Sequence, residues 1–488
     1  MAIEKYKNPI QFWIHVFFFL IFCSVSLINH YFFRSAGLDY GIANQALYQY
    51  AHFKSAICTQ LIGAEPISYL GLHFSLWVPI LSPFYWLFGS YTLLIFQNLA
   101  LIFGGVGLVK MANHLQLKEK VALIVLVQFY SSFTIFSAIA FDYHDNVIGA
   151  CFLPWLFYFY YKENLGLFVI SFLAILLSKE NMAIWLIFIS IGFYFRQKST
   201  EKSYFKLIGV MVLVSIFWFL FSGLILMPLL NPNGKFEQLT RFSHLGSNLS
   251  EIIIHIISHP IKMIRMFVES HIQPDIDEVV KHEFLWAVLF SGGIILIAKP
   301  SFLWIALPIF MQKLWNKELA FWGVSYHYQI ELAPIISLAI LFWIKPKNNK
   351  LFYYGITVLL LLSTAYSTFS LMENRRADYR PEKENIFVSN HYKIDFDIEK
   401  VNQKINEIPA NAKVCAQSNI LPHLANRDFI YHFPYIKDAE YLLIMKPNGN
   451  PYPLSNEDSD KLIDSLLSTP YWKEDSSALP LRILHLEK

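Results

Sequence analysis

Charged residues are scarce in this sequence. Lys, Arg, Asp and Glu make up only 15% of its 488 residues, whereas hydrophobic residues make up 55% and aromatic residues 17%. Soluble domains carry about 25% charged residues, so the composition excludes an ordinary soluble protein and predicts a polytopic integral membrane protein. The net charge of +3 is small and the basic residues are scattered, which argues against a nucleic-acid partner.

Cysteine is also rare, and its spacing is uninformative. The four cysteines form no CxxC pair and no Cys/His cluster with metal-ligand spacing; they are Cys23, Cys58, Cys151 and Cys415. This pattern predicts neither a disulfide framework nor a zinc site.

Long apolar runs dominate the first 370 residues. The first run follows Lys5 and Lys7 and has no small-residue cleavage site, so it reads as a retained helix. On a rule of about 20 residues per crossing, we predict about eleven spans, several of them short, near 10–33, 91–110, 121–140, 147–161, 165–178, 181–195, 207–228, 284–298, 301–313, 333–344 and 351–370. A further stretch, 74–88, contains Pro79 and Pro83 and reads as a span or as a re-entrant, interfacial segment.

The orientation follows from the short basic loops, because cytoplasmic loops accumulate Lys and Arg. With the N-terminus inside and 74–88 not crossing, all basic loops fall inside: Lys5 and Lys7; Lys110, Lys118 and Lys120; Lys162; Arg196, Lys198, Lys202 and Lys206; Lys299; and Lys345, Lys347 and Lys350. If 74–88 crossed the membrane, the basic clusters at Arg196–Lys206 and Lys345–Lys350 would lie outside. We therefore predict a transmembrane domain over 1–370, with outer loops at 34–73, 141–146, 229–283 and 314–332.

The C-terminal segment has a different composition. Residues 371–488 hold 15 Lys/Arg and 18 Asp/Glu, which predicts a solvated extracytoplasmic domain. Alternating apolar residues predict strands near 412–416, 429–433, 441–445 and 481–486, with helical segments at 419–424 and 459–467. This order is typical of a small α/β module.

Asp142, His144 and Asp145 form a dense polar cluster between two predicted spans. Ionisable groups beside a bilayer are costly, so such a cluster favours chemistry, ion passage or ligand binding over a simple loop of caps and turns. Asp39 heads an amphipathic segment, 38–47, that we expect to lie along the membrane surface. Its carboxylate reads equally as a helix N-cap or as a catalytic group.

Further polar residues fall at predicted span ends. His73 reads as an interfacial histidine or as a group that binds phosphate and relays protons. Lys179 and Glu180 interrupt an apolar run and either pair with each other or, through Lys179, meet a lipid-linked phosphate. His327 and Tyr328 belong to an aromatic segment that also fits an interfacial belt.

These residues carry a resemblance to a prokaryotic membrane protein family, domain of unknown function 2079, whose architecture is similar to that of the GT-C glycosyltransferases. The matching motifs are Leu38-Asp39-Tyr40-Gly41, Asn44-Gln45-Ala46-Leu47, His73-Phe74-Ser75, Phe141-Asp142-Tyr143-His144-Asp145, Ser178-Lys179-Glu180 and His327-Tyr328. The resemblance covers most of residues 30–345 and touches the tail between 408 and 434.

The resemblance implies a mostly helical, GT-C-like enzyme of the prokaryotic cytoplasmic membrane that serves the cell envelope. It implies a polyprenyl-phosphate sugar donor and a lipid, glycan or protein acceptor at the outer face. GT-C enzymes typically carry an essential acid in the first outer loop, where Asp39 stands, and a second acidic site after the third helix, where Asp142 and Asp145 stand. Asp39 is followed by Tyr40 rather than by the Glu of the protein mannosyl and aminoarabinose branches.

Glycosyl transfer needs a base for the acceptor and a cation for the departing phosphate. We expect Asp39 to be the base, and Asp142 and Asp145, assisted by His144, to bind Mg²⁺ or Mn²⁺ or to position the acceptor. Lys179, with His73 or His327, would face the phosphate, and Glu180 and Tyr328 complete the predicted substrate site. A transporter or lipid flippase, or a non-catalytic assembly protein, is the alternative.

Overall fold

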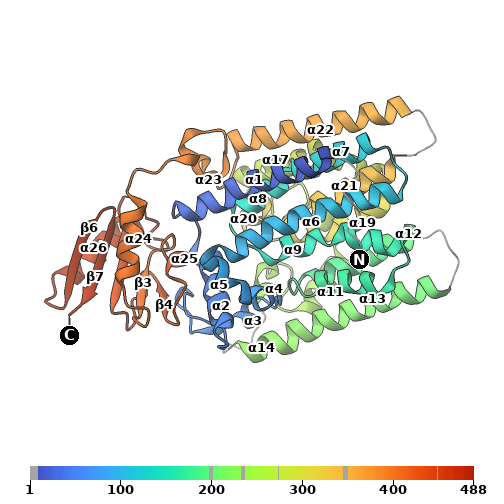
Figure 1. Ribbon diagram of the computed structural model, residues 1–488. Coiled ribbons are helices and arrows are strands. Elements are labelled where there is room, and N and C mark those ends of the chain that lie inside the picture. The colour runs from blue at the N-terminus through green and yellow to red at the C-terminus, as the bar shows by residue number, and fades with distance from the viewer. Residues whose placement is uncertain are drawn as a thin grey trace.

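A computed structural model describes residues 9–196, 202–231, 237–272, 274–344, 350–447 and 449–487. Among the predicted basic-loop residues, Lys5, Lys7, Lys198, Lys345 and Lys347 lie outside these ranges. The chain forms an elongated molecule in which a bundle of helices carries a small sheet region at one end (Figure 1). The prediction of a helical membrane protein with a small C-terminal α/β region is thus confirmed.

Among the described residues, five helical segments are long and apolar enough to cross a membrane: Pro9–Tyr31, Trp77–His114, Glu119–Ala140, Phe205–Leu230 and Leu351–Glu373. The bundle helices are α1 (Pro9–Tyr31), α6 (Thr92–His114), α7 (Glu119–Tyr130), α8 (Phe133–Ala140), α9 (Asp145–Cys151), α10 (Leu153–Tyr161), α11 (Leu165–Leu176), α12 (Met182–Arg196), α13 (Lys202–Phe221), α19 (Pro300–Leu314), α21 (Leu332–Trp343) and α22 (Lys350–Glu373). The other predicted spans correspond to shorter helices.

The predicted span at 284–298 is a broken helix. It consists of α17 (Pro274–Val288), η6 (Leu289–Gly293) and α18 (Ile295–Ala298). Ser291 and Gly292 leave helical geometry, with φ of +94° at Gly292, a conformation that glycine adopts without steric cost.

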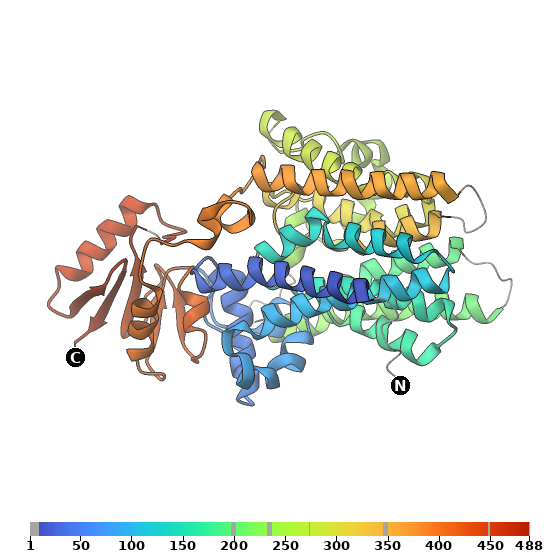
Figure 2. The ribbon, with the colours of Figure 1, turned by 45° about the horizontal axis from the view of Figure 1, so that its top comes forward.

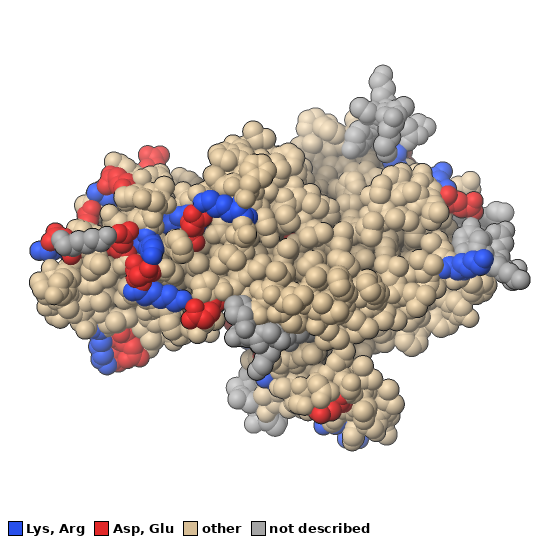
Figure 3. Space-filling model, turned by 90° about the horizontal axis from the view of Figure 1, so that it is seen from below, with Lys and Arg blue, Asp and Glu red and all other residues tan. Residues whose placement is uncertain are grey.

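The surface of the bundle matches a membrane environment. Figure 3 shows Lys, Arg, Asp and Glu at the two ends of the molecule and on a side lobe, with an uncharged band between the ends. Large apolar side chains are exposed on the bundle helices; Leu213 of α13 is 68% exposed and Leu359 of α22 is 63% exposed. Exposed apolar area on this scale indicates contact with lipid.

The stretch 74–88 lies at the sheet end of the bundle. It forms three short elements, α4 (Trp77–Leu81), η2 (Ser82–Phe84) and α5 (Tyr85–Phe88), before η3 (Gly89–Tyr91) and α6. The backbone turns at Gly89, where φ is +52°, and α4 and η2 pack on α2. Twelve helical residues span about 18 Å, short of the roughly 30 Å hydrocarbon core.

The segment 38–47 is not a surface helix. It folds as η1 (Gly37–Gly41) and α2 (Ile42–Ala51), followed by a two-stranded hairpin, β1 (Ile57–Cys58) and β2 (Ile67–Ser68), and by α3 (Tyr69–Leu72). Asn44 donates a 3.1 Å hydrogen bond to the carbonyl of Pro422, and Gln45 one of 2.9 Å to that of Asp428. The C-terminal region therefore covers the polar face that we expected to meet water.

The long connection before α19 is mostly helical. It contains η4 (Ser222–Leu226), α14 (Met227–Leu230), η5 (Glu237–Phe242), α15 (Leu249–Ser258), α16 (Pro260–Arg265) and α17; a shorter element, α20 (Leu319–Trp322), precedes α21. In Figure 2 the yellow-green helices of this connection protrude from the side of the bundle.

The C-terminal sheet region, residues 398–486, contains a five-stranded mixed sheet in the order β4-β3-β5-β7-β6. Its elements are α24 (Ile398–Glu407), β3 (Val414–Ala416), α25 (Leu421–Leu424), β4 (Ile430–His432), β5 (Tyr441–Met445), α26 (Asn456–Leu467), β6 (Trp472–Ala478) and β7 (Leu481–Leu486); α23 (Pro381–Glu384) and η7 (Ser389–Tyr392) lie in the linker that follows α22. The predicted strands are present. The sequence missed β6, because this largely exposed edge strand lacks apolar alternation.

Candidate functional site

Asp39 lies in the middle of η1, is half-buried, and lines a cavity of about 290 Å³. Ala36, not Asp39, is the N-cap of η1, and η1 has no side-chain cap hydrogen bond. No described residue donates a hydrogen bond to the Asp39 side chain. The N-cap interpretation is therefore wrong.

The electrostatic surroundings of Asp39 weaken its acidity. Burial raises the pKa of Asp39 to about 6, and the Asp142 carboxylate adds to this rise, while Lys179, Lys383 and Arg241 oppose it. A carboxylate with a pKa near neutrality suits a general base, because it both holds and releases a proton in that range.

Asp142 lies behind the cavity rather than in its wall. The backbone amide of Ala36 donates a 2.8 Å hydrogen bond to Asp142 Oδ2, and Lys383 Nζ lies 3.6 Å from the same oxygen. Asp142 has a φ of +85°, and Gln97 braces this strained turn by donating to the Asp142 carbonyl at 2.9 Å. Burial raises the pKa of Asp142, opposed by Lys383 and the hydrogen bonds.

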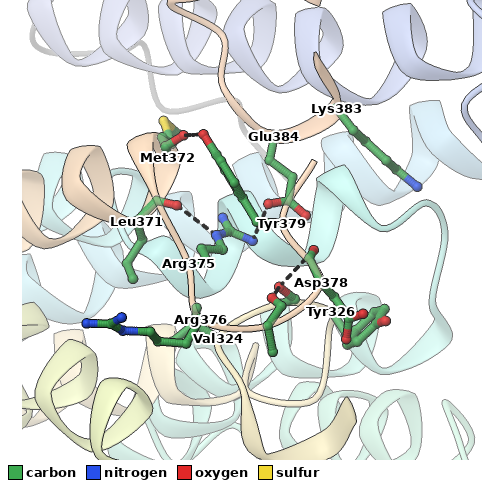
Figure 4. Close-up of polar contacts among 12 residues, drawn as sticks. Val324, Tyr326, Leu371, Met372, Arg375, Arg376, Asp378, Tyr379, Lys383 and Glu384 are labelled. Atoms are coloured by element: carbon green, nitrogen blue, oxygen red, sulfur yellow. Dashed lines mark hydrogen bonds and ion pairs between the residues drawn. The ribbon is translucent and has the colours of Figure 1, made fainter. Parts of the chain in front are cut away.

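Lys383 belongs to the linker that follows α22, and buried contacts fix this linker. Figure 4 shows Arg375 between the Leu371 carbonyl and Glu384; Arg375 donates to Leu371 O at 2.8 Å and pairs with Glu384 at 3.0 Å. Asn29 of α1 donates to the Lys383 carbonyl at 2.8 Å. The linker thus holds the buried Lys383 ammonium group beside the loop 141–146, which contains Asp142.

Asp145 lines the cavity and is fully engaged by hydroxyl donors. Ser75 donates to Oδ1 at 2.5 Å, Tyr143 donates to Oδ1 at 2.7 Å, and Tyr69 donates to Oδ2 at 3.0 Å. Burial raises the pKa of Asp145, while these hydroxyl groups and Lys179 stabilise the anion. The network fixes one wall of the cavity.

His144 and His327 stack against each other in the cavity wall. Their ring centroids are 3.4 Å apart, and Phe141 stacks on His144 at 5.0 Å. Both imidazoles are buried, and His144 Nε2 and His327 Nδ1 have no hydrogen-bond partner among the described residues. Burial lowers the pKa of both rings, so they act as neutral donors and acceptors.

His73 and Glu180 form a pair, so Glu180 does not pair with its neighbour Lys179. His73 Nδ1 lies 3.3 Å from Glu180 Oε1, and the Phe74 amide donates to Glu180 Oε2 at 3.2 Å. Burial favours neutral Glu180, but His73, Lys179 and the hydrogen bonds outweigh it and lower the pKa of Glu180 to about 2.

Two cations stand where the polar cavity meets a second cavity. Lys179 and Arg241 line both cavities, together with Gln238 and Tyr328. Neither cation has an ion-pair partner within 4.0 Å among the described residues; Arg241 lies over the Phe321 ring at 4.6 Å. Their charge is therefore available to an anionic ligand.

The second cavity is an apolar groove of about 240 Å³. Its walls come from α12, α15 and α19, and its apolar lining includes Trp185, Leu249, Ile252, Ile309 and Trp315. Glu331 also lines it and accepts a 2.9 Å hydrogen bond from Asn146. Burial raises the pKa of Glu331 to about 7, against the opposing effect of Asn146.

The predicted residues come together in space. Seven of them line the polar cavity: Asp39, His73, His144, Asp145, Lys179, His327 and Tyr328. Glu180 lines the groove and touches His73, and Asp142 stands behind the wall. The sequence missed Arg241, Glu331 and Lys383. Arg241 and Lys383 lie in long polar segments with no local signal, whereas Glu331 adjoins an apolar run and had the same signal as Lys179.

The geometry does not favour a divalent metal at Asp142 and Asp145. Protein donors occupy both carboxylates, and among the described residues no group of three or more His, Cys, Asp or Glu side chains is placed to hold a metal ion. Binding of Mg²⁺ or Mn²⁺ by Asp142 and Asp145 stays a prediction, and the proposed reaction includes no metal step.

A sequence-family comparison matches nearly the whole chain. Residues 29–476 match the model of a family described as "Predicted membrane protein (DUF2079)". No curated protein matches the sequence.

Comparison with solved structures shows that the chain shares its fold with one glycosyltransferase. The cryo-EM structure of the arabinofuranosyltransferase AftD from Mycobacteria aligns with a TM-score of 0.50 and 10% identity, over 98% of this chain and 40% of that one. An oligosaccharyltransferase from Archaeoglobus fulgidus aligns with a TM-score of 0.39 and 12% identity, over 90% and 66%. The chain thus spans less than half of AftD, and its fold is GT-C-like.

Proposed function

Because the chain belongs to DUF2079, a family of predicted membrane proteins, and has a GT-C-like fold, we propose that it is a membrane glycosyltransferase. The proposed reaction moves a sugar from a polyprenyl-phosphate donor to an acceptor at the outer face of the cytoplasmic membrane. The acceptor is a lipid, a glycan or a protein.

The position of Lys179 and Arg241 supports the proposal most directly. They stand between an apolar groove and a polar cavity, and a polyprenyl-phosphate sugar has the same order of parts: an apolar chain, an anionic phosphate and a polar sugar. In this arrangement the chain lies in the groove, the phosphate meets the two cations, and the sugar enters the cavity that holds Asp39.

The chemistry follows from the residues around the cavity. The Asp39 carboxylate takes the proton of the acceptor hydroxyl, and the acceptor oxygen forms a bond to the anomeric carbon. The bond from that carbon to the phosphate oxygen breaks, and its electron pair stays on the phosphate, whose charge Lys179 and Arg241 neutralise. The rings of His144 and His327 line the cavity that the sugar occupies in this proposal.

Substitution of Asp39 tests the reaction. Membranes containing the wild type should transfer radiolabelled sugar from polyprenyl phosphates to an endogenous acceptor, and Asp39→Asn should lose about 10²- to 10⁴-fold in rate, the usual contribution of a general base. Undiminished transfer by Asp39→Asn would refute the base assignment. Lipid movement across liposomes without transfer would favour the flippase alternative.

The orientation is part of the proposal. The end of α12 and the beginnings of α13 and α22 lie at the end of the bundle away from the C-terminal sheet region (Figure 1), and the basic residues Arg196 and Lys206 lie on these helices. Since basic loops stay in the cytoplasm, the cavity end faces outward. Reporter fusions after Lys118 and Lys202 should give cytoplasmic signals, and a fusion after Glu487 an outer one; reversed signals would contradict this.

A further inference from the structure

The helices α15 and α16 follow each other with only His259 between them, and together they form an arm that projects from the side of the bundle (Figure 2). Asn248 caps α15 by accepting from the Glu251 amide at 3.0 Å, and Glu251 accepts from the Ser247 amide at 2.8 Å, a capping box. Pro260 begins α16, where its missing N–H costs nothing. These signals specify two helices despite the polar surroundings.

The inner side of this α15–α16 arm packs against the rest of the protein. Ile252, Met263 and Met266 are buried in a cluster with Trp315, and Trp315 donates to the Met263 carbonyl at 3.0 Å. Leu249, Ile252 and Ile256 of α15 also line the apolar groove. The α15–α16 arm therefore forms the outer wall of the groove.

The outer side of this α15–α16 arm exposes an aliphatic stripe. Four isoleucines three or four positions apart form it, and each is about two-thirds exposed: Ile254 64%, Ile257 73%, Ile261 70% and Ile264 66%. Ile253 at 47% and Val268 at 43% widen it. Soluble surfaces rarely carry such a stripe.

A basic stripe runs beside the aliphatic one. His255 and His259 stack with ring centroids 4.4 Å apart, and Lys262 Nζ lies 3.5 Å from His255 Nε2. His255 and Lys262 each follow an isoleucine of the stripe by one position, and His259 lies four residues after His255, so the basic stripe borders the aliphatic one. An aliphatic face beside a basic face is typical of helices that lie in a membrane interface.

We infer that the α15–α16 arm lies in the phospholipid interface of the leaflet next to the polar cavity. The isoleucine stripe enters the acyl-chain region, and the His255–Lys262 stripe meets the lipid phosphates. The charge pattern and the side-on position beside lipid-exposed helices favour phospholipid as the occupant. The inference refines the predicted outer loop at 229–283: α15 and α16 within it lie between the bilayer and the groove, whether or not sugar is transferred.

Spin labelling of the full-length protein in liposomes tests the inference. Cys23→Ser removes the one native cysteine that is not buried, and nitroxides are then placed at Ile257→Cys and, as a matched control on the basic face, His255→Cys. The liposomes contain phosphatidylethanolamine and phosphatidylglycerol. We expect oxygen to collide more strongly than nickel-EDDA with the label at 257, and the reverse at 255.

Each outcome decides the question without substrate. Equal nickel-EDDA access at both labels would show that the α15–α16 arm is solvated and would overturn the inference. Exclusion of both reagents at 257, with a strongly immobilised spectrum, would show contact with a second copy or another protein and would also overturn it. Unchanged elution on size exclusion confirms that both labelled variants are folded. Failure of sugar transfer would leave this result unaffected.

Discussion

Lys383 Nζ lies 3.6 Å from Asp142 Oδ2, with both side chains almost fully buried. The two residues are far apart in sequence, yet the linker after α22 brings the cation against the loop that shapes the polar cavity. Breaking a buried pair leaves an uncompensated charge, whereas removing both charges costs much less.

We predict that Lys383→Met destabilises the protein by about 3–5 kcal/mol and that Lys383→Met combined with Asp142→Asn recovers most of this loss. Thermal unfolding in detergent measures the effect. Lys393→Met, at an exposed linker position, is the control and should leave the melting temperature unchanged. Equal destabilisation by the single and double variants would contradict a coupled pair.

The pH dependence of transfer should report on Asp39. Because burial and Asp142 raise the pKa of Asp39 to about 6, the base is protonated below that pH, and kcat/KM should rise with pH and level off above it. Asp142→Asn removes a repelling negative charge, so it should lower the pKa of Asp39 and shift the rising limb of the pH profile to lower pH. Asp395→Asn, at an exposed position, should leave the profile unchanged. A limb that does not move in Asp142→Asn would argue against Asp39 as the titrating group.

Lys179 and Arg241 should contribute to donor binding. Each lost charged contact to phosphate costs about 1.5–3 kcal/mol, so Lys179→Met and Arg241→Met should each raise KM for a polyprenyl-phosphate sugar roughly 10- to 150-fold. Lys317→Met removes an exposed cation that bonds Ser243 outside both cavities, and should not change KM. An unchanged KM in both cavity variants would refute the phosphate position.

Glu331 should make the protein less stable at alkaline pH. Its folded-state pKa of about 7 lies above the ordinary value of 4.5, so between these values the folded chain binds more protons than the unfolded chain and stability falls as pH rises. The full effect is about 3 kcal/mol from the size of the shift. Glu331→Gln should flatten the difference in melting temperature between pH 5 and pH 8, whereas exposed Glu318→Gln should preserve it.

The sequence predicted the class of fold and most of the cavity lining because local signals carried them. Apolar length marked the helices, and Asp39, His144 and Lys179 stood out as costly polar groups beside spans. The prediction of the DUF2079 family is confirmed. The lipid-phosphate role of Lys179 stays a prediction, as do the other residue roles.

Contacts between residues far apart in the chain could not be predicted from the sequence alone. Nothing near Lys383 signals its partner Asp142, and Arg241 is one basic residue in a polar connection. The amphipathic pattern at 38–47 indicated a surface helix, but Asn44 and Gln45 bond the C-terminal region instead. A polar face is equally consistent with water and with another part of the chain.

The C-terminal sheet region should position Asp39. The Gly37 amide donates to Ser418 Oγ at 3.1 Å, and a Cβ on Gly37 would lie 2.5 Å from Leu421 Cδ1 and 3.1 Å from the Ser418 carbonyl. Gly37→Ala should therefore push η1 away from α25 and reduce kcat with little effect on donor KM. Leu421→Ala in the same chain removes the closest contact and should restore part of the rate. Gly355→Ala adds a Cβ to open space and should leave transfer unchanged. If Gly37→Ala transfers sugar at the wild-type rate, contact with the C-terminal region does not set the position of Asp39.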